Sequence, residues 1–481
     1  MSDEKRITPR DEDFSAWYND IVTRAELADY SPVRGCMVIR PRGYGVWELM
    51  QRALDDMFKA TGHENAYFPM LIPQSFLARE AEHVEGFAPQ TAVVTHAGGK
   101  ELEEPLVLRP TSETIIYEMF GKWIQSYRDL PLLINQWANV VRWELRTRLF
   151  LRTTEFLWQE GHTAHVNEEE AEAETLNILA LYRRFMEDWM AMPVITGLKT
   201  DAERFAGALR TYACEALMQD NKALQAGTSH NLGQNFAKAF NVQYQTPSGD
   251  MDYVWNTSWG VSTRLIGGIV MAHGDDKGLV LPPRLAPIQV VIVPIWRSDA
   301  DLAAVLQVSE RVSEVLKESG VRVTVDDRDG MKPGAKYYAW ELRGVPVRLE
   351  IGPRDVAEGQ AVLARRTGGK VPVKMDEISE FVHETLNTLQ RTLLENARAR
   401  QAQNSYRNVT MDELVDLMTG NGGFAYGGFC GNAACEQRIK DQTKATIRVL
   451  PGPDFRSDKP PEKCVVCGEA STAEAVWAKA Y

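Results

Sequence analysis

The sequence has 481 residues, which at roughly 150 residues per domain suggests about three folded units rather than one. Its apolar content of 44% and charged content of 25% are typical of a globular protein. The net charge of −12 argues against a protein that coats nucleic acid through bulk electrostatics. The first residues are charged, and no apolar run approaches the roughly eighteen residues of a membrane span, so the sequence disfavours secretion and membrane insertion.

The first predicted elements are a helix and a short strand. Residues 43–62 have apolar side chains at helical spacing and end on Gly62, which predicts a helix with a glycine C-cap. The following apolar run, 63–73, is interrupted by Pro69 and Pro73. Because proline cannot donate to a β-ladder, this run is typical of an edge strand.

Two long extended segments follow, at 132–144 and 150–166, on either side of an arginine-rich link. They predict an antiparallel hairpin. The link could hold the end of an RNA or a triphosphate. Residues 169–190 then alternate charged and apolar positions with a helical period, which predicts a surface helix.

The second half of the chain changes pattern twice. Residues 255–285 predict a strand and a helix that end in the proline-rich linker LPPRLAP. Strands and helices then alternate, which indicates a compact α/β unit, and a glycine-rich segment with a cysteine-bearing tail begins near residue 404. We therefore expect three domains, 1–284, 285–403 and 404–481.

The predicted hairpin gathers unusual side chains on one face. Strand periodicity places Arg142 and Glu144 together on the first strand. A solvated face with cross-strand ion pairs explains any single pair of these groups. The whole row, with aromatic rings and a histidine among charges, suits a pocket for a nucleotide and a small zwitterion better. On the returning strand the row is Arg152, Thr154, Phe156, Trp158, Glu160 and His162.

Four of the six cysteines are close together near the C-terminus. Their C-x4-C and C-x2-C spacing is close to that of structural zinc sites with four thiolates, where the metal has no open position for catalysis. Redox pairs or unligated thiols remain the alternative, although a reducing compartment disfavours disulfides. Cys36 and Cys214 have no partner pattern and are expected to be ordinary free thiols. The predicted zinc ligands are Cys430, Cys435, Cys464 and Cys467.

Several motifs together resemble those of class II aminoacyl-tRNA synthetases. The segment from Arg142 to Glu160 resembles motif 2, the segment around Arg264 resembles motif 3, and the helix leading into Pro69 resembles motif 1, the dimer-forming element. Each motif alone is degenerate, but their order and spacing together are specific. The segments RPTSETIIY, FLWQEGHTAH and LQAGTSHNLGQNF and the cysteine module further resemble the prolyl-tRNA synthetase family of the archaeal and eukaryotic type, over essentially the whole chain.

The resemblance implies an α+β protein with an antiparallel-sheet catalytic domain, an α/β anticodon-binding domain and a small zinc-binding α/β module. It implies a cytoplasmic homodimer that activates L-proline with ATP and Mg²⁺ and transfers proline to the 3′ end of tRNA(Pro), without a membrane. The amino acid carboxylate attacks the α-phosphate, so the enzyme must align two anions and neutralise their charge. Members of the family also end in a tyrosine whose carboxylate turns back toward the active site, and this chain ends in Tyr481.

The resemblance also assigns site residues. Arg142, Glu144 and Arg264 would be catalytic, and their roles would be positional and electrostatic. The proline-binding residues would be Thr111, Glu113, Arg142, Trp158, Glu160, His162, Phe205 and His230, and the ATP-binding residues would be Arg142, Glu144, Arg152, Thr153, Phe156, Gln225, Thr228, Ser262 and Arg264. Taken one at a time, His230 could equally be a capping or core histidine, and Thr111 a turn residue.

The pyrrolidine ring offers only an apolar loop for recognition, and one methylene is worth about 1 to 3 kcal/mol. Alanine or cysteine could therefore be misactivated. Bacterial-type relatives carry an editing insertion between motifs 2 and 3, but fewer than one hundred residues separate His162 from Gly260, so we expect no editing domain. Glu341 and Arg348 are candidates for reading the two guanines of the proline anticodon, with a solvent-facing role as the alternative.

Two other functions compete with this hypothesis. A class II ligase for threonine, glycine or histidine would share the core but need a different pocket from Trp158, Glu160 and His162. A catalytically silent paralogue could instead sense tRNA. The presence of Arg142, Glu113 and Arg264 counts against the sensor, because sensing needs no arginines that align phosphates.

Overall fold

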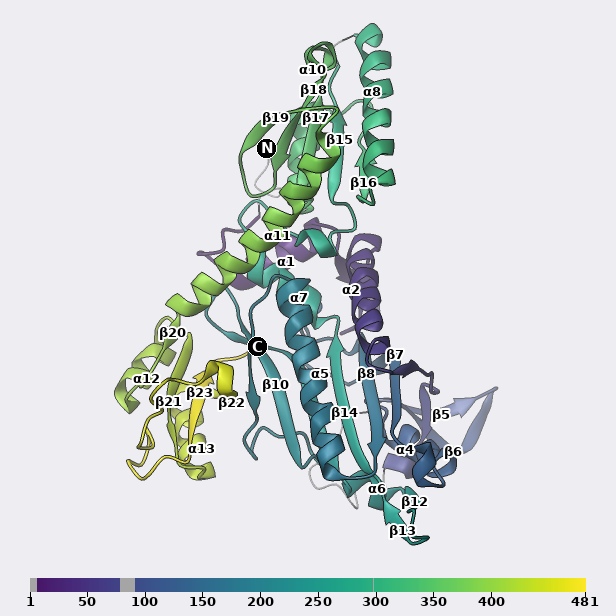
Figure 1. The fold of residues 1–481 in the computed structure, drawn as a ribbon, viewed down its shortest axis with the longest axis vertical. Coiled ribbons are helices and arrows are strands. Elements are labelled where there is room, and N and C mark those ends of the chain that lie inside the picture. Colours follow the sequence, from purple (N-terminus) through teal and green to yellow (C-terminus); the bar gives the residue numbers. More distant parts are fainter. Residues whose placement is uncertain (1–6, 78–90, 297) are drawn as a thin grey trace.

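The computed structural model describes residues 7–77, 91–296 and 298–481. Two sheets organise these residues, a large mixed sheet in the lower part of Figure 1 and a five-stranded sheet at its top. The predicted α+β class with a mainly antiparallel catalytic sheet is confirmed. No helix among the described residues is long and apolar enough to cross a membrane.

The large sheet has eleven strands within the described part of the chain. All its neighbours pair antiparallel except β3 with β7 and β20 with β21. The strands in spatial order are β20 (Ser405–Tyr406), β21 (Phe424–Phe429), β23 (Ala473–Ala478), β22 (Thr446–Pro451), β9 (Ile195–Leu198), β10 (Arg210–Leu217), β11 (Ala223–Gly233), β14 (Trp255–Ser262), β8 (Glu155–His165), β7 (Leu132–Val141) and β3 (Glu64–Asn65).

The predicted hairpin is confirmed as β7 and β8, which pair antiparallel over their whole length. The predicted edge strand at 63–73 is two short edge strands instead of one: β3 is outermost in this sheet, and β4 (Leu71–Pro73) lies at the edge of a three-stranded sheet. One detail is wrong: β8 begins at Glu155, so Arg152 and Thr154 lie outside the strand whose face they were expected to share. The reason is that the apolar run Leu149 to Leu151 is buried in the core and holds this segment in a turn.

Helices α1 (Phe14–Arg24), α2 (Pro41–Lys59), α5 (Glu168–Asp188) and α7 (Arg264–His273) contribute to the core that covers the central strands. The predicted first helix is α2, and Gly62 follows its end with φ of +89°. The predicted surface helix is α5, which begins with an Asn167 cap and three glutamates that suit the positive end of a helix dipole. Its apolar stripe, including Tyr182 and Phe185, is buried against the sheet.

Smaller elements complete this part of the chain. Helices α4 (Glu113–Trp123) and α6 (Asn235–Ala239) belong to a second core cluster. Three small sheets consist of β1 (Ala28–Tyr30) with β2 (Met37–Ile39), of β12 (Gln243–Gln245) with β13 (Met251–Tyr253), and of β4 (Leu71–Pro73), β6 (Lys100–Leu108) and β5 (Val93–Ala97), and a 3₁₀ turn η2 covers Tyr127–Asp129.

The predicted α/β unit is confirmed at the top of Figure 1. The linker before it contains the 3₁₀ turn η3 (Pro283–Leu285), which is packed rather than free. Strand β19 and the helix α11 have no predicted counterpart. The unit contains β15 (Val290–Pro294), α8 (Asp299–Glu318), β16 (Val323–Val325), α9 (Pro333–Leu342), β17 (Val347–Ile351), α10 (Pro353–Glu358), β18 (Gln360–Arg365) and β19 (Lys370–Lys374), and α11 (Ile378–Gln403) follows it.

Helix α11 runs from this unit to the C-terminal module (Figure 1). The module contains α12 (Met411–Thr419), α13 (Ala433–Thr443) and a 3₁₀ turn η4 (Pro453–Phe455) around strands β20 to β23. Its strand β22 pairs with β9 of the central strands, with Leu450 opposite Leu198. The module is therefore continuous with the catalytic sheet rather than a separate body.

Candidate functional site

A pocket opens over β8, β11 and β14, next to the start of α4. The structure brings most of the predicted site residues together around it. Those that line it are Thr111, Glu113, Arg142, Phe156, Trp158, Glu160, His162, Phe205, Gln225, Thr228, His230, Ser262 and Arg264.

Glu160 and His162 are the centre of a buried hydrogen-bond network. Oε2 of Glu160 lies 3.0 Å from Nε2 of His162, and its Oε1 accepts from Ser112 at 2.5 Å and Gln136 at 2.8 Å. Nδ1 of His162 lies 3.2 Å from the hydroxyl of Tyr117. Burial alone would raise the pKa of Glu160, but these hydrogen bonds outweigh it and lower the pKa below the usual 4.5. The pocket therefore contains a fixed negative charge.

Gly161 lies between these two residues and keeps the strand close to its neighbour. A Cβ at this position would lie 2.1 Å from the ring of Trp259, which is almost fully buried. Glycine therefore lets the tryptophan pack across β8 while Glu160 and His162 face the pocket.

A second buried carboxylate, Glu113, begins α4 and accepts a hydrogen bond from the hydroxyl of Thr111. Burial raises the pKa of Glu113 above 4.5, and the charge of Glu160 adds to the rise, while His162 opposes it. A cationic ligand beside Glu113 would compensate this cost, so the site is suited to an ammonium group.

His230 and Phe205 form one wall of the pocket. Their ring centroids are 4.7 Å apart, and Oγ1 of Thr211 lies 2.9 Å from Nδ1 of His230 and accepts the backbone N–H of Phe205 at 3.1 Å. Burial lowers the pKa of His230 to about 3, and the electrostatic effect of His162 adds to it. His230 is therefore neutral near pH 7 and contributes shape and hydrogen bonding rather than charge.

Arg142 follows β7 directly and borders the open pocket. Its Nε donates to the carbonyl oxygen of Pro110 at 2.9 Å, and its guanidinium carbon lies 5.6 Å and 5.3 Å from the ring centroids of Phe156 and Trp158. Solvent reaches the side chain through the pocket, while protein surrounds it elsewhere and lowers its pKa from 12.5. The guanidinium is thus fixed beside two carboxylates and two rings.

Arg264 is the first residue of α7, where a helix dipole favours anions. Its guanidinium donates from Nε to the carbonyl of Leu151 at 3.2 Å, and its backbone N–H donates to Oγ of Ser262 at 3.2 Å. Burial lowers the pKa of Arg264, and repulsion from Arg142 and Arg152 lowers it further. Several mutually repelling cations in one place indicate a site for a polyanion.

Three predicted residues do not line the pocket. Glu144 and Arg152 pair with each other at 3.4 Å in the segment between β7 and β8, and the hydroxyl of Thr153 donates to the carbonyl of Glu155 at 2.8 Å. Two of them still act on the site electrostatically: Glu144 attracts Arg142, and Arg152 repels Arg264.

Other lining residues were not predicted from the sequence. Lys199 and Glu203 lie between β9 and β10, in a segment without any motif, and Thr211 is the second residue of β10. Further unpredicted lining residues are Ala226, Gly227, Ser258, Trp259, Gly260 and Val261, which strand periodicity next to Gln225 and Ser262 could have indicated.

The two anticodon candidates lie around a second cavity in the α/β unit, lined also by aromatic and basic side chains. The guanidinium carbon of Arg348 lies 4.0 Å from the ring centroid of Tyr337, and Arg348 pairs with Glu350 at 2.9 Å. Glu341 pairs with Lys277 at 3.3 Å across the linker. In such a cavity a nucleic acid base can stack through its face and hydrogen-bond through its edge.

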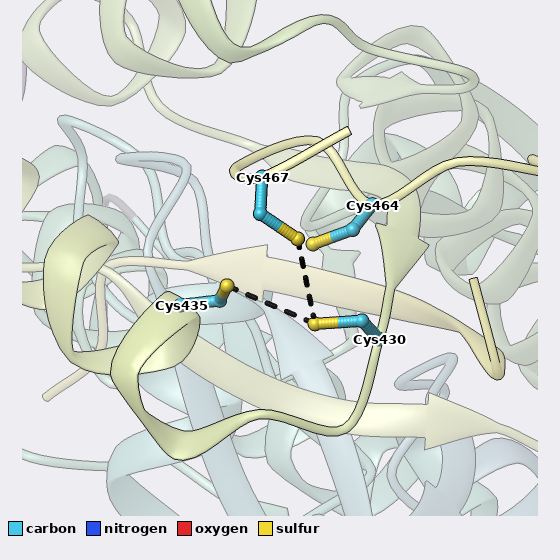
Figure 2. Close-up of side chains that lie close together, drawn as sticks. All are labelled: Cys430, Cys435, Cys464 and Cys467. Carbon is cyan, nitrogen blue, oxygen red and sulfur yellow. Dashed lines mark hydrogen bonds between the residues drawn. The ribbon is translucent and has the colours of Figure 1, made fainter. Parts of the chain in front are cut away.

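The four C-terminal cysteines converge, as Figure 2 shows. Their Sγ atoms all lie within 4.8 Å of one another. Sγ of Cys430 lies 3.7 Å from that of Cys435 and 3.8 Å from that of Cys467. Four thiolates around zinc at about 2.3 Å in a tetrahedron are about 3.8 Å apart, so the donor set fits that metal.

Tyr481 returns to the catalytic strands (Figure 1). Its backbone N–H donates to the carbonyl of Ala223 at 3.2 Å, and the guanidinium carbon of Arg148 lies 5.7 Å from its ring centroid.

Three family models match the chain in sequence order. The class II tRNA synthetase core domain (G, H, P, S and T) matches residues 94–273, the anticodon binding domain matches 289–385, and the prolyl-tRNA synthetase C-terminal domain matches 411–481.

Full-length relatives are also similar. The proline–tRNA ligases of Chlorobium phaeovibrioides and Chlorobium phaeobacteroides (strain DSM 266) are 57% and 55% identical to this chain, over 99% of it and at least 99% of their own length. A crystal structure of prolyl-tRNA synthetase from Cryptosporidium parvum, complexed with halofuginone and AMPPNP, is 38% identical and superposes with a TM-score of 0.93 over 99% of both chains.

Proposed function

The chain belongs to the proline–tRNA ligase family of class II aminoacyl-tRNA synthetases, and we propose from this that it activates L-proline with ATP, releases pyrophosphate, and transfers proline to the 3′ end of tRNA(Pro). The observation that best supports the proposal is one pocket that combines two buried carboxylates with two arginines. An amino acid presents an ammonium to the carboxylates and a carboxylate to an arginine, and ATP presents phosphates to both arginines.

Glu113 and Thr111 are proposed to accept hydrogen bonds from the two N–H groups of the proline ammonium, because proline is a secondary amine. The charge of the ammonium would offset the burial of Glu113. The pyrrolidine ring would lie in a pocket whose walls are Trp158, Glu160, His162, Phe205 and His230.

Arg142 is proposed to lie between the proline carboxylate and the α-phosphate, because it is fixed near both carboxylates and the ring of Phe156. It would align the attacking oxygen and stabilise the charge that develops on the phosphorus centre, without a covalent bond to the enzyme. The adenine would stack between Phe156 and Arg264, with Gln225, Thr228 and Ser262 around the nucleotide. Mg²⁺ would neutralise charge on the ATP phosphates, and Glu144, Arg152 and Thr153 are proposed near those phosphates from the family resemblance alone.

Zinc is proposed as a structural metal held by Cys430, Cys435, Cys464 and Cys467. The sulfur separations support it, and they are much longer than the roughly 2 Å of a disulfide bond. With four sulfur ligands the metal stabilises the C-terminal module and leaves no position for substrate.

The division into domains 1–284, 285–403 and 404–481 is proposed with their roles in catalysis, anticodon binding and metal binding. Glu341 and Arg348 are the proposed anticodon contacts. A cytoplasmic homodimer is proposed through the segment around Pro69, where Tyr67 is 73% exposed and Leu71 39% exposed. Sedimentation of the protein as a monomer at micromolar concentration would contradict the proposed homodimer.

The test is ATP–pyrophosphate exchange by purified protein with each of the twenty amino acids. Proline is expected to support the fastest exchange, with weaker exchange for alanine or cysteine. Fastest exchange with threonine, glycine or histidine would keep the fold and overturn the proposed proline pocket. No exchange with any amino acid would favour the tRNA-sensing alternative.

A further inference from the structure

One wall of the pocket depends on the C-terminal module. The wall is the segment from Lys199 to Phe205, which connects β9 to β10 and contributes Lys199, Glu203 and Phe205 to the lining. The backbone N–H of Lys199 donates to the carbonyl of Thr211 at 2.8 Å, and Thr211 in turn contacts Phe205 and His230. A shift of Lys199 is therefore transmitted to both aromatic rings of the pocket.

Lys199 is held by a buried charge triad. Its Nζ donates a hydrogen bond to Oε1 of Glu215 on β10 at 2.9 Å. The carboxylate of Glu215 also accepts hydrogen bonds from Nε and Nη2 of Arg448, at 3.1 and 2.9 Å. The side chains of Lys199, Glu215 and Arg448 are 1%, 0% and 8% exposed. Arg448 lies on β22, so the third member of the triad comes from the C-terminal module.

Two further contacts join the same module to the same wall. Oγ1 of Thr200 donates to Glu436 at 2.9 Å, and Lys440 lies 3.7 Å from Glu203. Both partners are on α13, the helix that also carries Cys435. Beside them, a Cβ on Gly197 would lie 2.2 Å from the carbonyl oxygen of Leu450, so the backbones of β9 and β22 are in direct contact there.

We propose that Arg448 is a positioning residue for proline binding: through Glu215 it fixes Lys199 and the wall that carries Phe205, so the C-terminal module shapes the amino acid side of the pocket. This inference rests on the proposed function. Arg448 does not line the pocket, and its hydrogen bonds reach Lys199 through Glu215. The ATP side, lined by Phe156, Ser262 and Arg264, has no hydrogen bond or ion pair to α13 or β22 among the described residues, and the charges of Glu215 and Arg448 act on Arg264 with opposite signs.

Arg448→Met is the informative substitution because of the charge balance of the triad. Two cations share one carboxylate, so removing Arg448 leaves Lys199 and Glu215 as a neutral pair. Glu215→Gln would instead leave two buried cations together, which is strongly destabilising. Arg448→Lys keeps the charge but loses the two-pronged contact with Glu215.

The experiment measures ATP–pyrophosphate exchange with proline for the full-length wild type, Arg448→Met, Arg448→Lys and the control Arg438→Met, whose arginine is exposed on α13. Arg448→Met is expected to raise the KM for proline about fivefold or more, while kcat and the KM for ATP change less than about twofold. Arg448→Lys is expected to fall between Arg448→Met and the wild type, and Arg438→Met to match the wild type.

Thermal unfolding of each variant shows whether it is folded, and Arg448→Lys decides the outcome if Arg448→Met does not fold. An unchanged KM for proline in either variant overturns the inference. A rise in the KM for proline that is matched by an equal rise in the KM for ATP and an equal fall in kcat also overturns the inference, because that result indicates only general destabilisation. Absence of proline exchange in the wild type and in Arg438→Met would instead refute the proposed function, and the inference with it.

Discussion

The carboxylate of Glu160 and the imidazole of His162 face each other at 3.0 Å on β8, on either side of a glycine. Ser112 and Gln136 hold the other oxygen of Glu160. The three donors keep Glu160 ionised despite complete burial, so His162 has a fixed orientation and a fixed charge beside it.

Glu160→Gln is expected to raise the KM for proline about tenfold, because a hydrogen bond to a charged group is worth about 1.5 to 3 kcal/mol. The KM for ATP should be unchanged. Pyrophosphate exchange measures both constants. The control is Glu155→Gln, at the exposed start of the same strand. A variant whose KM for both substrates rises together would contradict a specific role in the proline pocket.

Arg348→Gln is expected to raise the KM for tRNA in aminoacylation about tenfold or more, since a base contact by arginine is worth about 1 to 3 kcal/mol. Pyrophosphate exchange needs no tRNA and should keep its wild-type rate. Glu350 remains paired with Lys370 at 2.7 Å, so the fold should tolerate the change. Arg354→Gln, at an 88% exposed arginine in the same unit, is the control. An unchanged KM for tRNA would contradict an anticodon contact by Arg348.

Metal analysis is expected to find about one zinc per chain. Cys435→Ser should lose the metal and unfold at a lower temperature, because the binding free energy of a structural zinc contributes to folding. Cys36→Ser is the control, since Cys36 lies outside the cluster. Less than one zinc per chain together with four titratable C-terminal thiols would rule out the zinc site.

Acid is expected to destabilise the fold through His165, which is 4% exposed. Burial lowers its pKa from 6.5 to about 4, with Glu174 opposing and His63 adding to the shift. The unfolded chain therefore binds a proton that the folded chain does not, and stability falls as the pH drops from 6.5 toward 4, by about 3 kcal/mol for this residue.

Urea unfolding across this pH range tests the effect. His165→Gln should lose less stability toward pH 4 than the wild type, whereas His96→Gln, at an exposed position, should follow the wild type. Parallel pH curves for wild type and His165→Gln would show that His165 does not titrate in this window.

Local patterns predicted the β7–β8 hairpin and the helices α2 and α5, because alternation and helical spacing determine which side chains share a face. Alternation also predicted the pocket residues that the hairpin carries, whereas those on other elements, such as Glu113, His230 and Arg264, came from the family resemblance. The same alternation was wrong where it was extended beyond the strand. Arg152 lies outside β8 and bridges Arg148 across a turn whose residues, Leu149 to Leu151, are buried in the core.

Long-range contacts could not be predicted in this way. Lys199 and Glu215 are 16 residues apart, and Glu215 and Arg448 are 233 apart, so no local pattern links them. The pairing of β9 with β22 involves only two residue pairs and leaves no signal in either segment. Lys199 was therefore missed as a pocket residue, and the C-terminal module was expected to be separate from the catalytic sheet.

The most direct test of the central claim is pyrophosphate exchange with proline by the wild type, Arg142→Ala and the control Arg354→Ala. We expect proline-dependent exchange in the wild type and the control, and a loss of at least about a hundredfold in Arg142→Ala, because a preorganised donor to a developing charge is worth about 10² to 10³ in rate. Proline-dependent exchange that survives in Arg142→Ala would contradict the proposed site.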